Sequence, residues 1–272
     1  MSVETIIFIC FKQAMVAKRS LLLLLNVLLI LCFVHLFWKR KAPLLAESSK
    51  FEPNYMIRKN SFTSTSAQFS GTYAIYTFEN LLNAEEAKLL EIAAISTLHR
   101  SGTISKNPIS DRRTSYNTFL KTDVFQGTEI YNILCRIEHV AATLSGKPLV
   151  NQEPLQVARY LGGEYYKEHY DACVPENSEM CIEDARHHGM RYATLLIYMN
   201  DVDPEHGGET YFPLINAKFR PKVGTGVFFF NLLPNNENQH HPLSQHAALP
   251  LKGGTKWICN KWIRCKPYKQ HQ

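Results

Sequence analysis

LQVARYLGGEYYKEHYD, residues 155–171, predicts two short β-strands that are separated by a Gly-Gly pair. The first strand is expected at 155–160 and the second at 165–171. The second ends in His169 and Asp171, which share one face of a strand because side chains two residues apart point the same way. An imidazole and a carboxylate placed together in this way are two of the three ligands that a mononuclear iron(II) site needs.

A second stretch, SQHAALPLKGGTKWICNKW at residues 244–262, brings the other groups that such a site needs. His246 is a second imidazole. With His169 and Asp171 it completes a set that holds iron(II) on one face and leaves the opposite positions open. Lys256 is a cation suited to hold the far end of a dicarboxylate that chelates the metal. Strand alternation allows Lys256 to point either inward or outward, and the sequence leaves both orientations open.

Two other interpretations of these residues remain open at this point. A zinc hydrolase can use three similar ligands, although no general base stands out by its spacing. Ordinary buried histidines are the simpler alternative for any single imidazole. Five further histidines fall in Gly- or Asn-rich segments, and we expect these to face solvent: His187, His188, His206, His240 and His241.

The rest of the chain predicts helices first and strands later. Asn83 and Glu86 form a capping-box pair that opens an amphipathic helix, and a second helix is expected from Thr128 to Leu144. An opening strand is expected from Thr72 to Phe78. Further strands are expected at 192–200, 209–213, 227–232, 245–249 and 256–264. We therefore expect an α+β domain with a double-stranded β-helix (jelly-roll) core and flanking N-terminal helices.

The N-terminal part of the chain predicts one transmembrane helix. Residues 20–38, SLLLLLNVLLILCFVHLFW, are apolar on every face, carry Lys and Arg on both flanks, and are long enough to cross a bilayer. No Ala-x-Ala-like cleavage site follows promptly, which favours an uncleaved signal anchor over a signal peptide. We expect a cytosolic tail at 1–19, a stem at 39–70, a folded domain at 71–267 and a short tail at 268–272.

Composition indicates one folded domain and disfavours nucleic acid as a partner. Apolar residues make up 45% of the chain, and a net charge of +6 is spread without a basic cluster that interleaves aromatics. Five of the seven cysteines lie beyond the anchor, so at least one stays unpaired within a monomer. Cys173 and Cys181 could bridge in an oxidising compartment, whereas Cys259 and Cys265 would lie too far apart along one strand.

Several stretches together resemble the prolyl 4-hydroxylase family of 2-oxoglutarate/iron(II) dioxygenases. They are residues 155–171 and 244–262 quoted above, RYATLLIYMNDV at 191–202, GGETYFP at 207–213 and PKVGTGVFFFNL at 221–232. The resemblance covers about residues 71–267. It is to the collagen and plant cell-wall type, and to its short, membrane-anchored, plant-like form.

The resemblance implies catalytic roles for the residues that match. His169, Asp171 and His246 would be the iron ligands, and Lys256 would bind the C5 carboxylate of 2-oxoglutarate. Two further residues would donate hydrogen bonds to this cosubstrate: Tyr160 and Thr194.

The resemblance also implies a peptide groove. Four residues match positions that border it in such enzymes: Arg113, Tyr166, Arg191 and Trp262. One position departs from the pattern, because Arg264 stands where many relatives have His.

The activity that the resemblance implies is hydroxylation of peptidyl proline to 4-hydroxyproline, with release of succinate and CO₂. L-ascorbate would restore the iron after uncoupled turnover, and a proline-rich protein would bind as an extended polyproline II segment. With the anchor, this implies a single-pass type II protein of the endoplasmic reticulum or Golgi membrane, with the catalytic domain in the lumen. The natural substrate and the oligomeric state stay open. A 2-oxoglutarate oxygenase with a non-proline substrate and a non-catalytic jelly-roll binding module are the competing functions.

Overall fold

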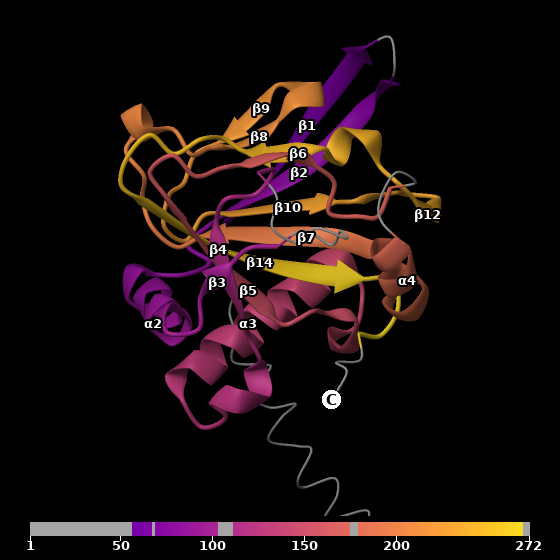
Figure 1. Ribbon diagram of the computed structural model, residues 1–272. Coiled ribbons are helices and arrows are strands. Elements are labelled where there is room, and N and C mark those ends of the chain that lie inside the picture. The colour runs from indigo at the N-terminus through magenta and orange to yellow at the C-terminus, as the bar shows by residue number, and fades with distance from the viewer. Residues whose placement is uncertain (1–55, 67–68, 103–110, 175–178, 269–272) are drawn as a thin grey trace, which may run out of the picture. The chain divides into compact units, whose positions relative to one another are not determined.

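Two facing antiparallel β-sheets dominate the computed structural model, which describes residues 56–66, 69–102, 111–174 and 179–268 (Figure 1). The larger sheet runs, in spatial order, β1 (Met56–Ser66), β2 (Phe69–Glu79), β10 (Gly226–Phe230), β7 (Arg191–Tyr198), β14 (Thr255–Arg264), β5 (Leu155–Leu161), β4 (Tyr116–Leu120) and β3 (His99–Arg100). The smaller sheet runs β6 (Tyr166–His169), β13 (His246–Ala248), β8 (Thr210–Phe212) and β9 (Ala217–Phe219). A separate pair joins β11 (Leu232–Leu233) and β12 (Asn236–His240). The central neighbours of both sheets, such as β2 and β10, β7 and β14, or β6 and β13, are far apart in the chain, as the predicted jelly roll requires.

Three α-helices occur in the described part of the chain: α2 (Ala84–Ile95), α3 (Glu129–Ser145) and α4 (Glu179–His188). The predicted capping box opens α2, because the Asn83 side chain accepts from the Glu86 N–H and the Glu86 carboxylate accepts from the Asn83 N–H. Thr128 caps α3, and Gly146 ends it at a φ of 69°, which glycine adopts without strain. Both predicted helices are therefore confirmed.

Short 3-10 turns connect the strands and helices of the described ranges. They are η1 (Thr122–Phe125), η2 (Leu149–Asn151), η3 (Pro204–His206), η4 (Pro213–Ile215) and η5 (Pro242–Ser244).

The hydrophobic core has two layers, one on each face of the larger sheet. Helices α2 and α3 pack on its outer face, and the smaller sheet covers its inner face (Figure 1). Strand β14 serves both layers: Trp257 and Cys259 pack in the helix-side cluster, whereas Ile258 packs between the sheets. Lys256 shares the inward face with Ile258 because side chains alternate along a strand. This settles the orientation that the sequence left open.

The folded part begins earlier than the sequence predicted. The expected stem at 39–70 contains β1, which pairs with β2 over eleven register partners from Met56↔Glu79 to Ser66↔Phe69. As an edge strand, β1 leaves residues such as Met56 and Ile57 exposed, so it carries no alternating apolar pattern. Pairing with β2 rather than burial therefore accounts for this strand, and the prediction of a structureless stem was wrong there.

The segment between β6 and β7 also differs from expectation. We predicted a loop there, but α4 occupies residues 179–188 and buries only Cys181 and His188. His188 and, elsewhere, His241 are buried, so the prediction that they face solvent was wrong. His187 and His206 are exposed as expected.

The predicted anchor at 20–38 and the tail at 1–19 lie outside the described residues. Among the residues that are described, no helix is both long and apolar enough to span a bilayer. Of the expected C-terminal tail at 268–272, Tyr268 is described, and its N–H donates to the Val150 carbonyl at 2.8 Å.

Candidate active site

Three side chains that can bind a metal meet at the edge of the smaller sheet, and they come from two distant parts of the chain. β6 and β13 are neighbours, and His169 lies directly opposite His246 in their register. Asp171 follows two residues after His169, just beyond the end of β6. One ligand atom from each of the three lies within 4.8 Å of the other two. The predicted triad is thus assembled by strand pairing.

Backbone carbonyls orient both imidazoles. The Nδ1–H of His169 donates to the Lys167 carbonyl at 2.8 Å, and the Nδ1–H of His246 donates to the Ser244 carbonyl at 2.9 Å. A carbonyl only accepts, so Nδ1 carries the proton and Nε2 offers its lone pair. The two Nε2 atoms lie 3.8 Å and 3.9 Å from the two carboxylate oxygens of Asp171. This second layer of hydrogen bonds is typical of metal-binding histidines.

Two donors from the larger sheet hold the carboxylate of Asp171. Thr194 Oγ1 and Trp262 Nε1 donate to Oδ2 at 2.7 Å and 2.9 Å. The Thr194 hydroxyl also accepts from the Asn231 side chain at 2.8 Å, which fixes its direction of donation. Thr194 lies opposite Trp262 in the register of β7 and β14, so the two donors reach the same oxygen.

The protonation states of the triad suit a divalent cation. Burial and the neighbouring His246 lower the pKa of His169 well below its usual 6.5, so it is neutral. Burial alone would raise the pKa of Asp171, but His246, His169 and Arg191 together bring it down to about 2. One carboxylate and two imidazoles meet within 4.8 Å of one another, and this donor set fits iron(II).

A cavity opens beside the triad. It is lined by residues from both sheets: Arg113, Tyr160, Tyr166, His169, Asp171, Leu196, Thr210, His246, Ala247, Ala248, Lys256, Ile258, Asn260 and Trp262. The walls therefore combine apolar and aromatic side chains with an equal number of polar and charged groups that converge on the cavity.

Lys256 is the most unusual residue of this cavity. It is 1% exposed, and its Nζ donates to the Gly208 carbonyl at 2.6 Å. The rings of Tyr160 and Tyr198 lie 5.2 Å and 5.8 Å from Nζ. Burial lowers the pKa of Lys256 to about 7 against the opposing effect of the Glu209 carboxylate, and in the part of the chain that the structure describes no carboxylate lies within ion-pair distance of Nζ. A buried ammonium without an anion is costly, so its cavity fits an anionic ligand.

Arg113 and Tyr166, which the resemblance places along a peptide groove, lie together on one wall of the cavity. The Tyr166 ring stacks on His169 at 3.5 Å between centroids, and the Arg113 guanidinium lies 5.0 Å over the same ring. Arg113 is also tied to Gln156 by a hydrogen bond of 3.2 Å. These contacts bring a cation and an aromatic face next to the metal-binding triad.

Two predicted site residues, Thr194 and Arg191, are not among the residues that line the cavity. Thr194 donates to Asp171, and Arg191 pairs with Glu153. Trp262 lines the cavity, yet its indole N–H is already committed to Asp171. The resemblance identified positions near the site, but it did not predict which partner each of these side chains contacts.

Sequence reasoning also missed several cavity residues. Ile258 and Asn260 lie two and four residues after Lys256 on β14, so they share its face of the strand. The two-residue period of a strand could therefore have identified them. Thr210 and Leu196 carry no comparable signal, because their positions depend on how β8 and β7 face each other.

The fold and the triad together define a jelly roll with a candidate metal site beside a buried lysine, and comparison with known proteins agrees. The profile of the 2OG-Fe(II) oxygenase superfamily matches residues 155–264. An Arabidopsis thaliana protein named "Probable prolyl 4-hydroxylase 3" is 30% identical over 217 residues, which are 71% of this chain and 70% of that protein. The human prolyl 4-hydroxylase subunit alpha-1 is 35% identical over 190 residues, which are 70% of this chain.

A solved structure is similar as well. The viral collagen prolyl hydroxylase vCPH of Paramecium bursaria Chlorella virus-1, in its complex with 2-oxoglutarate, superposes with a TM-score of 0.52 at 30% identity, covering 70% of this chain and 94% of that one. The chain belongs to the prolyl 4-hydroxylase family of 2-oxoglutarate/iron(II) oxygenases. It spans 34% of the human subunit and 51% of a relative from Acanthamoeba polyphaga mimivirus.

Proposed function

We propose that this protein hydroxylates peptidyl proline to 4-hydroxyproline, using iron(II), 2-oxoglutarate and O₂ and releasing succinate and CO₂. The observation that carries the proposal is Lys256, a buried cation in the same cavity as the triad, which forms no ion pair with any residue that the structure describes. A metal alone would not need that cation. A dicarboxylate that reaches from the metal to Lys256 would satisfy it.

In this proposal His169, Asp171 and His246 hold the iron on one face. Bound iron supplies the oxidation of an unactivated C–H bond, with O₂ and 2-oxoglutarate as co-reactants. The chain's own part is to fix the three ligand atoms, which its carbonyl and Thr194 contacts support. It also keeps bulk water out, since the ligand side chains are at most 13% exposed.

Lys256 would bind the C5 carboxylate of 2-oxoglutarate, and Tyr160 would assist it. Tyr160 lines the cavity, is 3% exposed, and its ring lies beside the lysine head. A charge-assisted hydrogen bond in so dry a place is stronger than one in water.

A proline-rich peptide would enter past Arg113 and Tyr166. An aromatic face flanked by a cation suits a polyproline II segment, whose carbonyls accept hydrogen bonds and whose rings pack on aromatics. The related viral enzyme is described as a collagen prolyl hydroxylase. Collagen-like, extensin-like and arabinogalactan-like peptides are the substrates to compare, and L-ascorbate is the reductant to include.

We also propose that residues 20–38 anchor the protein in the endoplasmic reticulum or Golgi membrane, with the domain in the lumen. The disulfide between Cys173 and Cys181 supports this, because such bonds persist in oxidising compartments. Protease protection of a C-terminally tagged full-length chain in intact microsomes tests it. Digestion of the tag without detergent would contradict lumenal topology.

The activity test measures oxygen gain by mass spectrometry across a panel of proline-rich peptides, with succinate release measured in parallel. We expect one added oxygen atom per modified proline, dependent on iron and 2-oxoglutarate, and its loss in Asp171→Ala. Lys261→Met, on the same strand but facing the helices, is the control that should retain turnover.

The same assay separates the competing functions. Succinate release only with a non-proline substrate would reject proline hydroxylation. Binding of metal and 2-oxoglutarate without any turnover would favour a non-catalytic module. Hydrolysis without O₂ consumption would favour a zinc hydrolase.

A further inference from the structure

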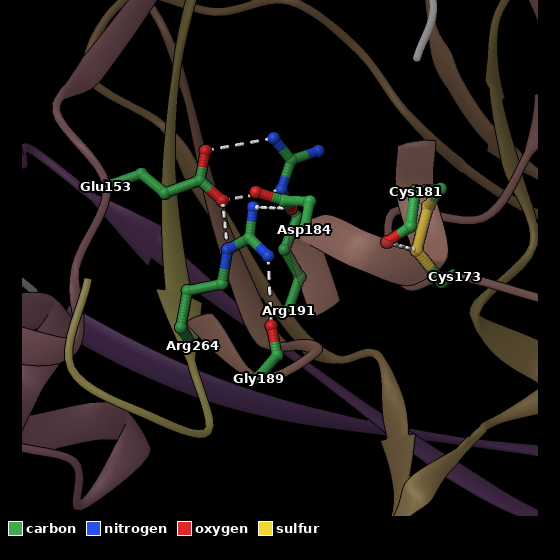
Figure 2. The surroundings of a disulfide bond; sticks show 7 residues. All are labelled: Glu153, Cys173, Cys181, Asp184, Gly189, Arg191 and Arg264. Atoms are coloured by element: carbon green, nitrogen blue, oxygen red, sulfur yellow. Dashed lines mark hydrogen bonds and ion pairs between the residues drawn. A yellow bond between two sulfur atoms is a disulfide. The ribbon is translucent and has the colours of Figure 1, made fainter. Parts of the chain in front are cut away.

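The segment that connects β6 to β7 starts at Asp171 of the metal-binding triad and is fastened by a disulfide, which Figure 2 shows. It begins at Asp171 and contains α4, and β7 then starts at Arg191. The disulfide from Cys173 to Cys181 fastens the chain two residues past Asp171 to the first turn of α4. The carboxylate of the triad therefore stands at the end of a covalently closed loop.

A group of four charges, with Glu153 and Arg264 buried and Arg191 and Asp184 partly exposed, lies next to this loop (Figure 2). Arg191 donates to both oxygens of Glu153, at 2.7 Å and 2.9 Å. Arg264 Nε donates to Oε1 of the same carboxylate at 2.6 Å. The fourth member is Asp184, on α4. Two carboxylates and two guanidinium groups balance, so the group is neutral as a whole, and planar guanidinium groups fix the geometry of such pairs.

Arg264 is the member that reaches α4. Its Nη2 lies 2.6 Å from Asp184 Oδ2, and its Nη1 donates to the Gly189 carbonyl at 2.9 Å. Gly189 has a φ of +70°, and a Cβ there would lie 2.8 Å from the Lys266 nitrogen, so only glycine fits this approach. The guanidinium of Arg264 thus joins the end of β14 to both the side and the end of the helix.

The charge group is connected to the triad through Trp262. The Arg191 guanidinium lies 3.5 Å over the Trp262 ring, and the indole Nε1 donates to Asp171 Oδ2 at 2.9 Å. Glu153 is itself fixed to β14, since its N–H donates to the Trp262 carbonyl at 3.0 Å. Asp171 is therefore held from two sides: by the disulfide-closed loop and by the indole under Arg191.

We propose that Arg264 is a positioning residue for metal binding, and that α4, held by Arg264, Asp184 and the disulfide, is a clamp that keeps the Asp171 carboxylate in place. The inference rests on the proposed iron site and adds to it a set of contacts that hold one of the metal ligands in place. The Arg264 guanidinium contacts Glu153, Asp184 and Gly189 at once. A histidine, which the family pattern has at this position, offers only two ring nitrogens and could not make all three contacts. The clamp would make the metal affinity depend on contacts that never touch the metal.

The test measures Co(II) affinity of the full-length chain by equilibrium dialysis, together with the visible absorption of the bound Co(II). Neither readout needs turnover. We expect Arg264→Met to weaken Co(II) binding about 10- to 100-fold, the usual range for groups that orient metal ligands, and to alter the absorption band. Arg264→Lys should recover part of the affinity, because one ammonium cannot reach all three partners.

Two milder variants keep the test informative if Arg264→Met does not fold. Asp184→Asn removes the ion pair to α4 but leaves Glu153 paired, and Cys173→Ser with Cys181→Ser opens the loop. Each should weaken Co(II) binding by less than Arg264→Met. Lys261→Met is the matched control: it removes another buried cation of β14, whose partner Glu138 lies on α3, and Co(II) binding should not change.

Equal Co(II) affinity in wild type, Asp184→Asn and the double-serine variant would overturn the clamp. A loss of Co(II) affinity in Lys261→Met as large as in Arg264→Met would overturn it as well, because the loss would then reflect the lower stability of the folded protein and not the contacts of Arg264. Wild-type protein that binds no Co(II) would refute the iron site itself and with it this inference. Normal Co(II) binding by wild type without any hydroxylation would leave the clamp testable and would count only against the proposed reaction.

Discussion

Two lysines on β14 are equally buried but differently partnered. Lys256 and Lys261 are each 1% exposed, and burial lowers the pKa of both. An odd spacing puts them on opposite faces of the strand. Lys261 faces the helices, where Glu138 lies 3.0 Å away. Lys256 faces the cavity, where a backbone carbonyl accepts its hydrogen bond.

The difference separates a structural cation from a binding cation. The fold itself satisfies Lys261, so its contribution is to stability. None of the described residues forms an ion pair with Lys256, so a ligand that supplies an anion would offset the cost of burying its ammonium. A site that is destabilising without its ligand is a common mark of function. The four predictions below run from the largest expected effect to the smallest.

Replacing Lys256 by Met should affect activity most. We expect kcat/KM for 2-oxoglutarate to fall by about 100-fold or more, since a buried charge pair with the ligand is lost. The free energy of unfolding should rise by about 1 to 2 kcal/mol, because a buried ammonium is replaced by an apolar chain of similar length. Succinate release and urea denaturation measure the two quantities. Loss of both activity and stability would contradict the assignment of Lys256 as a binding cation.

The corresponding Lys261→Met change should show the opposite pattern. Glu138 would lose its cation, so the free energy of unfolding should fall by about 2 kcal/mol, less than for a fully buried pair because Glu138 is 22% exposed. Thr122 still donates to that carboxylate at 2.6 Å, which limits the loss. KM for 2-oxoglutarate should stay at the wild-type value. A raised KM would break the contrast between the two lysines.

Ligand binding should depend on pH through Lys256. Its native pKa is about 7, against an ordinary value of 10.5. As pH rises through 7 the ammonium loses its proton, so 2-oxoglutarate affinity should fall about tenfold between about pH 6 and about pH 8. The unfolded lysine still holds its proton up to 10.5, so this group makes the folded protein more stable as pH rises from 7 toward 10.5.

Isothermal titration of 2-oxoglutarate at several pH values measures the first effect, and urea denaturation measures the second. Both slopes should be smaller in Lys256→Met. A pH-independent affinity in wild type would show that the ammonium stays charged throughout this range.

The sequence was sufficient for features that depend on local pattern. The capping box at Asn83 and Glu86 and the pairing of His169 with Asp171 both depend on residues close together, although the strand predicted at 165–171 ends at His169 and leaves Asp171 just beyond it. Edge strand β1 was missed because its residues are mostly exposed and polar, so pairing alone defines it. Helix α4 was missed for a similar reason, since its buried side chains do not form an apolar stripe.

What the sequence could not supply is which group reaches which partner across the sheet. Thr194 and Arg191 were expected to face ligands, but register brings Thr194 opposite Trp262 and points both at Asp171. Glu153 carried no signal, because its role exists only once Arg191 and the end of β14 converge on it. Such contacts depend on tertiary packing, which spacing along the chain does not encode.

Tyr160→Phe should give the smallest effect. It separates the role of the Tyr160 ring, which lies beside Lys256, from the role of the Tyr160 hydroxyl. Phenylalanine keeps the ring beside the Lys256 ammonium, so the cation–π contact and the stability should persist. The lost hydroxyl would remove one hydrogen bond to the ligand carboxylate, and we expect KM for 2-oxoglutarate to rise about 3- to 10-fold with little change in kcat. An unchanged KM would mean that Tyr160 only packs beside Lys256 and donates no hydrogen bond to 2-oxoglutarate. A large fall in kcat would instead place its hydroxyl close to the reacting atoms, contrary to the role proposed here.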